Sequence, residues 1–182
     1  MNTVQPIRDL GKLEKIIHYL RDRNDRDFIM FLIGIYTGLR ISDILTLRVV
    51  DVKGSHIFIR EKKTGKEKKL VINPQLKREL KRYIFNKEDD EFLIKSRKGN
   101  NQHISRSTAY RILNDVAKHF KLSELGTHSM RKTYGYHFYQ ETKDVATLQE
   151  LFNHTDQKTT LRYIGVRQDD LDKKMLKFRY KF

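Results

Sequence analysis

The sequence contains no cysteine, and only two of its 182 residues are proline. Without cysteine, a disulfide scaffold, a thiolate zinc site and a cysteine nucleophile are all excluded. The scarcity of proline leaves no Pro-rich linker that would divide the chain. The longest apolar run, Phe28 to Tyr36, is too short to cross a bilayer, and the N-terminus lacks the pattern of a signal peptide. We therefore expect one cytoplasmic domain.

Acidic residues are too few to balance the basic ones. The chain has 38 Lys and Arg against 23 Asp and Glu, which gives a formal charge of +15. Such a charge favours an anionic partner, either nucleic acid or a membrane surface. Membrane binding needs an amphipathic helix with an exposed apolar face or a lipidation signal, and the sequence shows neither. Nucleic acid is favoured, while a merely soluble basic protein stays open as the alternative.

Hydrophobic periodicity predicts a mainly helical α+β fold with one small antiparallel hairpin. Residues 57–59 and 70–72 read as two strands joined by a charged turn. Thr127 and Asp144 are the predicted N-caps of two helices. Helical spacing recurs over residues 10–20, 26–36, 41–47, 74–84, 110–120, 127–139, 145–152 and 171–182.

Two familiar catalytic motifs are absent. In the Lys-Thr-Gly-Lys run at 63–66, Arg60 stands where a P-loop needs Gly, and Glu67 where it needs Ser or Thr. No His-Glu-x-x-His occurs, and no histidine pair has ligand spacing backed by carboxylates. We therefore expect no metal and no cofactor.

Two segments in the first half of the chain are candidate sites. Arg40 precedes Asp43 by three residues, a spacing that puts both side chains on one helix face, so Asp43 is expected to hold the Arg40 guanidinium. The alternative is an ordinary surface ion pair. The hairpin turn at 60–69 carries six basic and two acidic residues and is suited to a phosphate backbone. The alternative is a solvated turn.

Two further segments lie in the second half. His128 and Arg131 share a helix face and combine an imidazole with a planar cation. His154 is followed nine residues later by Tyr163. Taken alone, such a His and Tyr are more often structural or core residues than reacting ones.

The order of these elements carries more information than any one of them. Arg-x-x-Asp, a hairpin Lys, His-x-x-Arg and a His followed by Tyr together resemble the tyrosine recombinase, or phage integrase, family over about residues 8 to 175. The resemblance implies the catalytic-domain fold of that family. It also implies a site-specific recombinase or integrase that cuts and rejoins DNA without metal or ATP.

The resemblance assigns a role to each candidate residue. Tyr163 would attack a DNA phosphodiester and form a 3′-phosphotyrosyl bond, while Arg40 and Arg131 would clamp the non-bridging oxygens. The other roles are proton transfer with the tyrosine for His128, a phosphate contact for His154, protonation of the 5′-oxygen for Lys63, support for Asp43, and DNA binding for Lys62, Lys66 and Lys68.

The chain departs from the family pattern in two respects. Asn153 stands where Gly usually precedes the second His, a mild change because Asn tolerates the left-handed conformation that ends helices. Larger members carry a separate N-terminal helical domain, whereas few residues precede the first predicted helix here. The expectation is a single catalytic domain over 1–182, either a short member or a catalytic fragment, with weak and salt-sensitive DNA binding.

The resemblance also bears on assembly. We expect a monomer in free solution and a homotetramer on double-stranded DNA, in which a tail over 164–182 packs on its own domain or on a neighbouring protomer. An accessory DNA-bending protein is a further partner that the family allows, and a bacterial, phage or mobile-element origin is implied. A type IB topoisomerase and a catalytically silent DNA-binding module are the alternatives.

Overall fold

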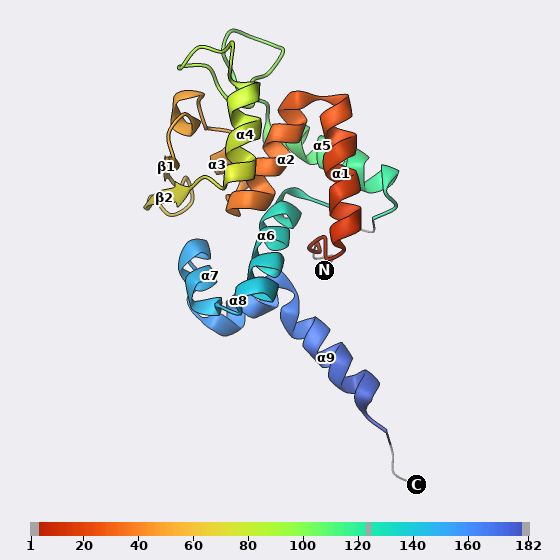
Figure 1. The fold of residues 1–182 in the computed structure, drawn as a ribbon. Helices are drawn as coiled ribbons and strands as arrows, with labels where there is room; N and C mark the ends of the chain where they lie inside the picture. Colours follow the sequence, from red (N-terminus) through yellow and green to blue (C-terminus); the bar gives the residue numbers. More distant parts are fainter. Residues whose placement is uncertain (1–3, 123–124, 180–182) are drawn as a thin grey trace.

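The structure is a computed structural model that describes residues 4–122 and 125–179. The described chain is mainly helical with one antiparallel hairpin, as the periodicity predicts (Figure 1). Its elements follow the order α1 (Leu10–Arg23), α2 (Asp25–Thr37), α3 (Ile41–Ile44), η1 (Val50–Val52), β1 (His56–Arg60), β2 (Glu67–Val71), α4 (Pro74–Tyr83), α5 (Arg106–His119), α6 (Thr127–Thr142), α7 (Val145–Phe152), α8 (Gln157–Ile164) and α9 (Val166–Lys177).

Helix α2 forms the centre of the main core and packs against α1, α4 and α6. Its residues 28–33 are all buried, which explains why this segment is apolar on every face. A second, smaller core lies between α6, α7 and α8 and contains Leu148, Phe152 and Ile164. Helix α6 therefore links the body above it to the pair α7 and α8 below it (Figure 1).

The hairpin pairs β1 with β2 so that His56 lies opposite Val71 and Arg60 opposite Glu67. The N–H of Gly65 donates to the carbonyl of Glu61 at 2.8 Å and closes the turn. Gly65 has φ +68°, in the left-handed region that Gly adopts without steric cost. The hairpin thus carries the charged segment 61–66 at its tip.

Helix boundaries differ from the predicted ones at several places: α5 begins at Arg106 and α9 at Val166, and α8, which carries Tyr163, was not predicted. Thr127 is the first residue of α6 and not its N-cap; Gly126 takes that position, and its N–H donates to Ser129 Oγ at 3.1 Å. Helix α3 ends at Ile44, short of the predicted residue 47, because the N–H groups of Thr46 and Leu47 form 3₁₀-type bonds to the carbonyls of Asp43 and Ile44. Asp144 caps α7 as predicted, accepting from the N–H of Thr147 at 2.9 Å.

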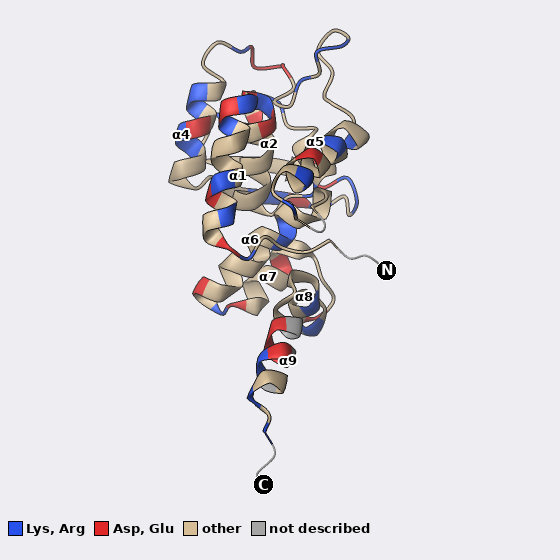
Figure 2. Ribbon diagram, turned by 90° about the vertical axis from the view of Figure 1, so that its right-hand side faces the viewer, with Lys and Arg blue, Asp and Glu red and all other residues tan. Residues whose placement is uncertain are grey.

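The N-terminal segment lies against α6 and the start of α9. Ile7 N–H donates to Thr133 Oγ1 at 2.9 Å, and Arg8 pairs with Asp169 at 3.1 Å. Helix α9 then projects away from the body (Figures 1 and 2), and Met175 is 74% exposed. The predicted tail stripe also includes Leu171 and Phe182, whose side chains lie outside the described part of the structure.

Across residues 4–122 and 125–179, we find no helix with both the length and the apolar character needed to span a bilayer.

Candidate active site

Arg131 lies on α6 with only 3% of its surface exposed. Its guanidinium donates to the carbonyl of Gly38, just after α2, and to that of Phe152, at the end of α7, at 3.1 Å for the latter. The Phe152 ring lies beneath it, 4.0 Å from Cζ. Burial lowers the pKa of Arg131 to about 10, so the group stays protonated at neutral pH. Two helix ends therefore hold a buried cation in one pose.

Arg40 occupies the N-cap position of α3, with an extended backbone at φ −70° and ψ 146°. It donates to Glu61 Oε1 at 2.8 Å and lies 3.5 Å from the carbonyl of Phe152. Arg131 donates to that same carbonyl, so a single backbone oxygen brings the two guanidinium groups together. Two adjacent cations of this kind form a site for an anion.

Tyr163 lies on α8, and its hydroxyl is 3.3 Å from Nδ1 of His128 on α6. Burial raises the pKa of the Tyr163 phenol, while the charges of Arg131 and Arg40 oppose that rise. Burial lowers the pKa of His128, and nearby cations, including Arg131 and Lys63, lower it further. At neutral pH the imidazole is therefore uncharged and able to accept a proton from the phenol.

His154 follows the C-cap of α7 and makes a T-shaped contact with the Tyr163 ring, with centroids 5.1 Å apart. Its Nδ1 is 3.0 Å from Thr160 Oγ1 on α8. Burial, together with the charges of Arg131 and Arg40, lowers the pKa of His154 to about 4. His154 is therefore a neutral group beside the two guanidinium groups.

The hairpin tip places three of the predicted lysines at the edge of this site. Lys62, Lys63 and Lys66 are exposed, and Lys66 lines an open cleft with His154 and Gln149. Lys63 is near enough for its charge to act on His128. The hairpin thus stands beside the two guanidinium groups.

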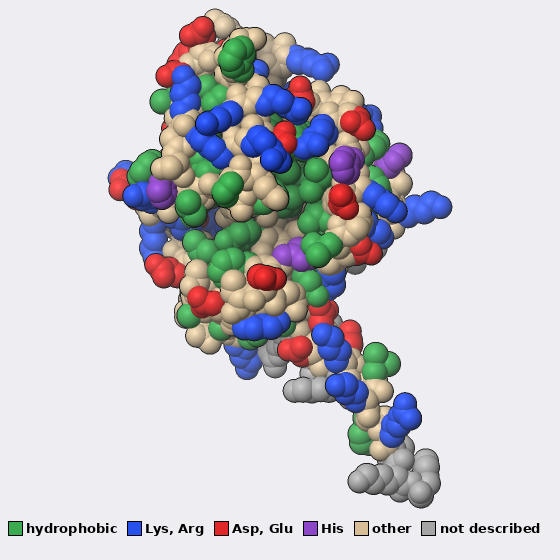
Figure 3. All heavy atoms as spheres, in the orientation of Figure 1, with side chains coloured by type: hydrophobic (Ala, Val, Ile, Leu, Met, Phe, Trp, Pro, Cys, Tyr) green, Lys and Arg blue, Asp and Glu red, His purple; other side chains and the backbone are tan. Residues whose placement is uncertain are grey.

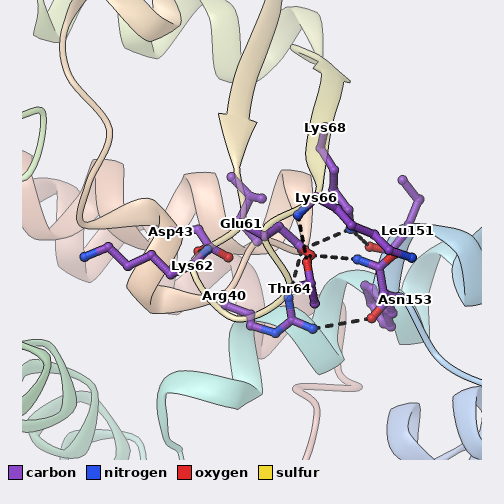
Figure 4. Close-up of polar contacts among 12 residues, drawn as sticks. Arg40, Asp43, Glu61, Lys62, Thr64, Lys66, Lys68, Leu151 and Asn153 are labelled. Carbon is purple, nitrogen blue, oxygen red and sulfur yellow. Dashed lines mark hydrogen bonds and ion pairs between the residues drawn. The ribbon is translucent and has the colours of Figure 1, made fainter.

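Two of the predicted residues have other charged partners than the sequence suggested. Asp43 does not hold the Arg40 guanidinium, because Arg40 is in the extended N-cap position and reaches Glu61 instead. Asp43 is 2% exposed and accepts from the N–H of Lys62 at 3.0 Å, so it anchors the hairpin to α3. Lys68, predicted to bind DNA, turns its ammonium inward to Glu61 at 3.0 Å, and its side chain is 11% exposed (Figure 4).

Glu61 is the one prominent residue at this site, within the described part of the chain, that the motif analysis missed. Its side chain is fully buried and lies at the centre of the contacts in Figure 4. Burial alone would raise its pKa, but hydrogen bonds from Thr64 and Lys68 and the charges of Lys68 and Arg40 lower it overall. In the sequence, Glu61 resembled an acidic residue of a solvated turn. The only sign of burial was its position two residues after Ile59, on the face of the strand that also carries Ile57.

Comparison with known proteins agrees with this geometry. The model of the family described as "Phage integrase family" matches residues 9–169. A protein of Bacillus subtilis named "Probable integrase/recombinase YoeC" is 46% identical over 170 residues, which cover 93% of each chain. The tyrosine recombinase XerA of Pyrococcus furiosus is 28% identical and is matched over 85% of this chain but only 55% of its own length.

Solved structures show the same fold. A crystal structure of XerA recombinase superposes with a TM-score of 0.76 at 19% identity, covering 99% of this chain and 67% of that one. A lambda integrase dimer bound to a COC′ core site gives 0.71 at 15% identity, covering 100% and 64%. The predicted fold class is confirmed by these neighbours.

Proposed function

This chain belongs to the phage integrase family, the tyrosine recombinases, and we propose that it cuts and rejoins double-stranded DNA through a covalent bond to Tyr163. The family assignment confirms the resemblance of the motifs and makes the chain an enzyme of site-specific DNA recombination. The observation that carries the roles of individual residues is the convergence of Arg40, Arg131 and Tyr163 within one site. The Phe152 carbonyl joins the first two, and the Tyr163 hydroxyl lies against His128.

In the cleavage step, the Tyr163 oxygen attacks phosphorus while its proton passes to the neutral His128. The bond from phosphorus to the 5′-oxygen breaks, and Lys63 supplies the proton for that leaving oxygen. Arg40 and Arg131 bind the non-bridging oxygens, where negative charge grows in the pentavalent transition state. His154 Nδ1 lies 3.0 Å from Thr160 Oγ1, whose hydroxyl donates to the Asp156 carbonyl at 3.2 Å. A phosphate contact through Nε2 requires that this hydroxyl proton turn to Nδ1, because the neutral ring carries one proton.

In the rejoining step, the 5′-hydroxyl of another strand attacks the phosphotyrosyl bond and Tyr163 regains its proton. One phosphoester bond forms for each one that breaks. Because the covalent intermediate conserves the bond energy, the cycle consumes no nucleotide. Two permanently charged guanidinium groups supply the electrophilic stabilisation.

The partner that fits this surface is duplex DNA. The exposed hairpin cations Lys62, Lys63 and Lys66 border the site, and the chain carries a net charge of +15. Figure 3 shows that the face in view also carries many other Lys and Arg side chains. Contacts of this kind position a protein on the phosphate backbone and weaken with salt.

We also propose that residues 1–182 act as one catalytic domain and that α9 docks on a neighbouring protomer in a tetramer formed on DNA. Met175 and Leu176 of α9 are 74% and 82% exposed on a helix that stands clear of the body (Figure 3). Apolar side chains so exposed gain free energy when a partner surface covers them.

Covalent capture tests the proposed reaction. Nicked duplexes with a randomised central segment are incubated with the protein, and DNA that stays attached after denaturation is sequenced. We expect an adduct that is absent in Tyr163→Phe, while Tyr163→Phe still binds the recovered duplex. If no adduct forms with any duplex although DNA binds, the chain is a silent binding module. If plasmids relax with no preference among sites, it acts as a topoisomerase.

A further inference from the structure

The carboxylate of Glu61 accepts from four side chains that come from three separate parts of the chain. Oε1 lies 2.8 Å from Arg40 and 3.0 Å from Lys68. Oε2 accepts from Thr64 Oγ1 and from Asn153 Nδ2, both at 2.7 Å. The donors come from α3, the hairpin and the C-cap of α7 (Figure 4). One buried anion therefore ties these three elements together.

Each of the elements that Glu61 joins carries a residue of the candidate active site. Arg40 is bound directly, Thr64 follows Lys63, and Asn153 precedes His154. Glu61 itself is fully buried, so it is not placed to touch a DNA phosphate. Its main-chain N–H and carbonyl also bond across the turn, to the Lys66 carbonyl and the Gly65 N–H. Its effect on the reaction must therefore pass through the groups it holds.

The charge balance points to Arg40 as the group that depends most on Glu61. Arg40 and Arg131 are both cations beside the Phe152 carbonyl, and Lys68 is a third cation close by. Without a buried anion these like charges would repel one another at low dielectric. The 2.8 Å contact to Glu61 fixes the Nη1 edge of Arg40, whereas Nη2 makes only a long 3.5 Å contact to the Phe152 carbonyl and can turn to a phosphate oxygen.

We propose that Glu61 is a positioning residue that orients the Arg40 guanidinium for the scissile phosphate. This inference rests on the proposed function. A guanidinium displaced by about 1 Å costs on the order of 100-fold in rate, which is close to the effect of losing one preorganised donor. Asn153 then has a physical role at a position where the family usually has Gly, since its amide holds the second carboxylate oxygen.

The test compares Glu61→Gln with Glu67→Gln. Both substitutions remove one negative charge from the hairpin, but Glu67 is exposed and pairs with exposed Arg60. Cleavage is followed in single turnover on the nicked duplex recovered by covalent capture. We expect Glu61→Gln to cleave about 100-fold more slowly, with the DNA affinity of Glu67→Gln. Urea unfolding of both variants checks that each is fully folded under the assay conditions, so that the two rate constants can be compared.

A neutral scissile linkage identifies the group through which Glu61 acts. When a methyl group replaces one non-bridging oxygen, the linkage loses its charge and depends less on a correctly placed Arg40. The ratio of the cleavage rate constant of Glu67→Gln to that of Glu61→Gln should then be at least about 10-fold smaller than on the charged linkage. If Glu61→Gln does not fold, Glu61→Asp keeps the charge but withdraws it by one methylene, and should show a deficit of about 10-fold that shrinks in the same way.

The outcomes separate this inference from the proposed function. Equal cleavage by Glu61→Gln and Glu67→Gln, or a deficit unchanged on the neutral linkage, overturns the role of Glu61 while the wild-type adduct still stands. A wild-type protein that forms no adduct overturns the proposed function itself.

Discussion

Arg40 and Arg131 share one acceptor, the carbonyl of Phe152, at 3.5 and 3.1 Å. The two residues are far apart in the sequence and lie on different helices, so their meeting at a single backbone oxygen is a property of the fold. The oxygen belongs to the last residue of α7, where helix carbonyls are unpaired and carry partial negative charge. That charge lets two guanidinium groups approach each other in the absence of a phosphate.

The two arginines should differ in what their loss does to the protein. We expect Arg40→Lys and Arg131→Lys each to lower single-turnover cleavage by about 10²–10³. Arg131→Lys should also reduce the free energy of unfolding, by roughly 2 kcal/mol more than Arg40→Lys, because Arg131 is 3% exposed and satisfies two carbonyls. Urea unfolding measures the second effect, and equal unfolding midpoints would contradict it.

Lys66 and Lys68 should separate DNA binding from folding. Lys66 is exposed at the hairpin tip, so Lys66→Ala should reduce the slope of log K against log salt by about 1. Lys68 is turned inward to Glu61, so Lys68→Ala should leave that slope unchanged and reduce the free energy of unfolding by roughly 1–3 kcal/mol. Binding titrations at several salt concentrations measure the slope for each variant. A reduced slope in Lys68→Ala would show that the Lys68 ammonium leaves Glu61 to reach DNA.

The candidate active-site residues could be predicted from the sequence, because the order of their motifs resembles one family and each side chain suits the proposed chemistry. A phosphodiester needs fixed cations and a nucleophile, and Arg40, Arg131 and Tyr163 carry those functions in their side chains. The hairpin and most helices were predictable from periodicity for an equally local reason, since burial of one face follows the geometry of each element.

The partners of those residues were not predictable, because they depend on tertiary packing. The spacing of Arg40 and Asp43 suggested a helix-face pair, yet Arg40 sits at an N-cap where that spacing rule does not hold. Lys68 looked like its exposed neighbours because the sequence does not show that Glu61 lies buried beside it. The buried carboxylate of Glu61 is thus the partner of both Arg40 and Lys68, and the sequence alone did not indicate it.

Asn153 sets a backbone preference against a side-chain hydrogen bond. Its φ of 50° and ψ of 48° are left-handed, where Gly is favoured by roughly 1 kcal/mol. Its amide donates to the charged Glu61 at 2.7 Å, a bond of roughly 1.5–3 kcal/mol. The free energy of this hydrogen bond is larger than the backbone preference for Gly, so Asn153→Gly should lower the free energy of unfolding by about 1 kcal/mol. A more stable Gly variant in urea unfolding would show that the backbone term dominates.

The low pKa of His154 predicts a loss of stability in mild acid. Folding favours the neutral imidazole, with a pKa of about 4 against 6.5. The unfolded chain therefore binds the proton more readily, and stability is full above pH 6.5 and falls as the pH drops towards 4. The loss should reach up to roughly 3 kcal/mol. His154→Gln should lack this part of the loss, and parallel unfolding curves for both proteins from about pH 7 to about 4.5 would contradict the assignment.

The exposed end of α9 should matter for assembly and not for folding. Met175→Ser combined with Leu176→Ser changes no charge and removes two side chains that are 74% and 82% exposed. We expect the free energy of unfolding to stay within about 0.5 kcal/mol of the wild type. In sedimentation velocity, all proteins should be monomers without DNA, and only the double variant should fail to form a tetramer on the recovered duplex. Phe85→Ser, which removes a side chain 84% exposed outside the tail, is the matched control.

A double variant that assembles as the wild type does would show that α9 does not bridge protomers. A wild-type tetramer in the absence of DNA would show that assembly precedes DNA binding.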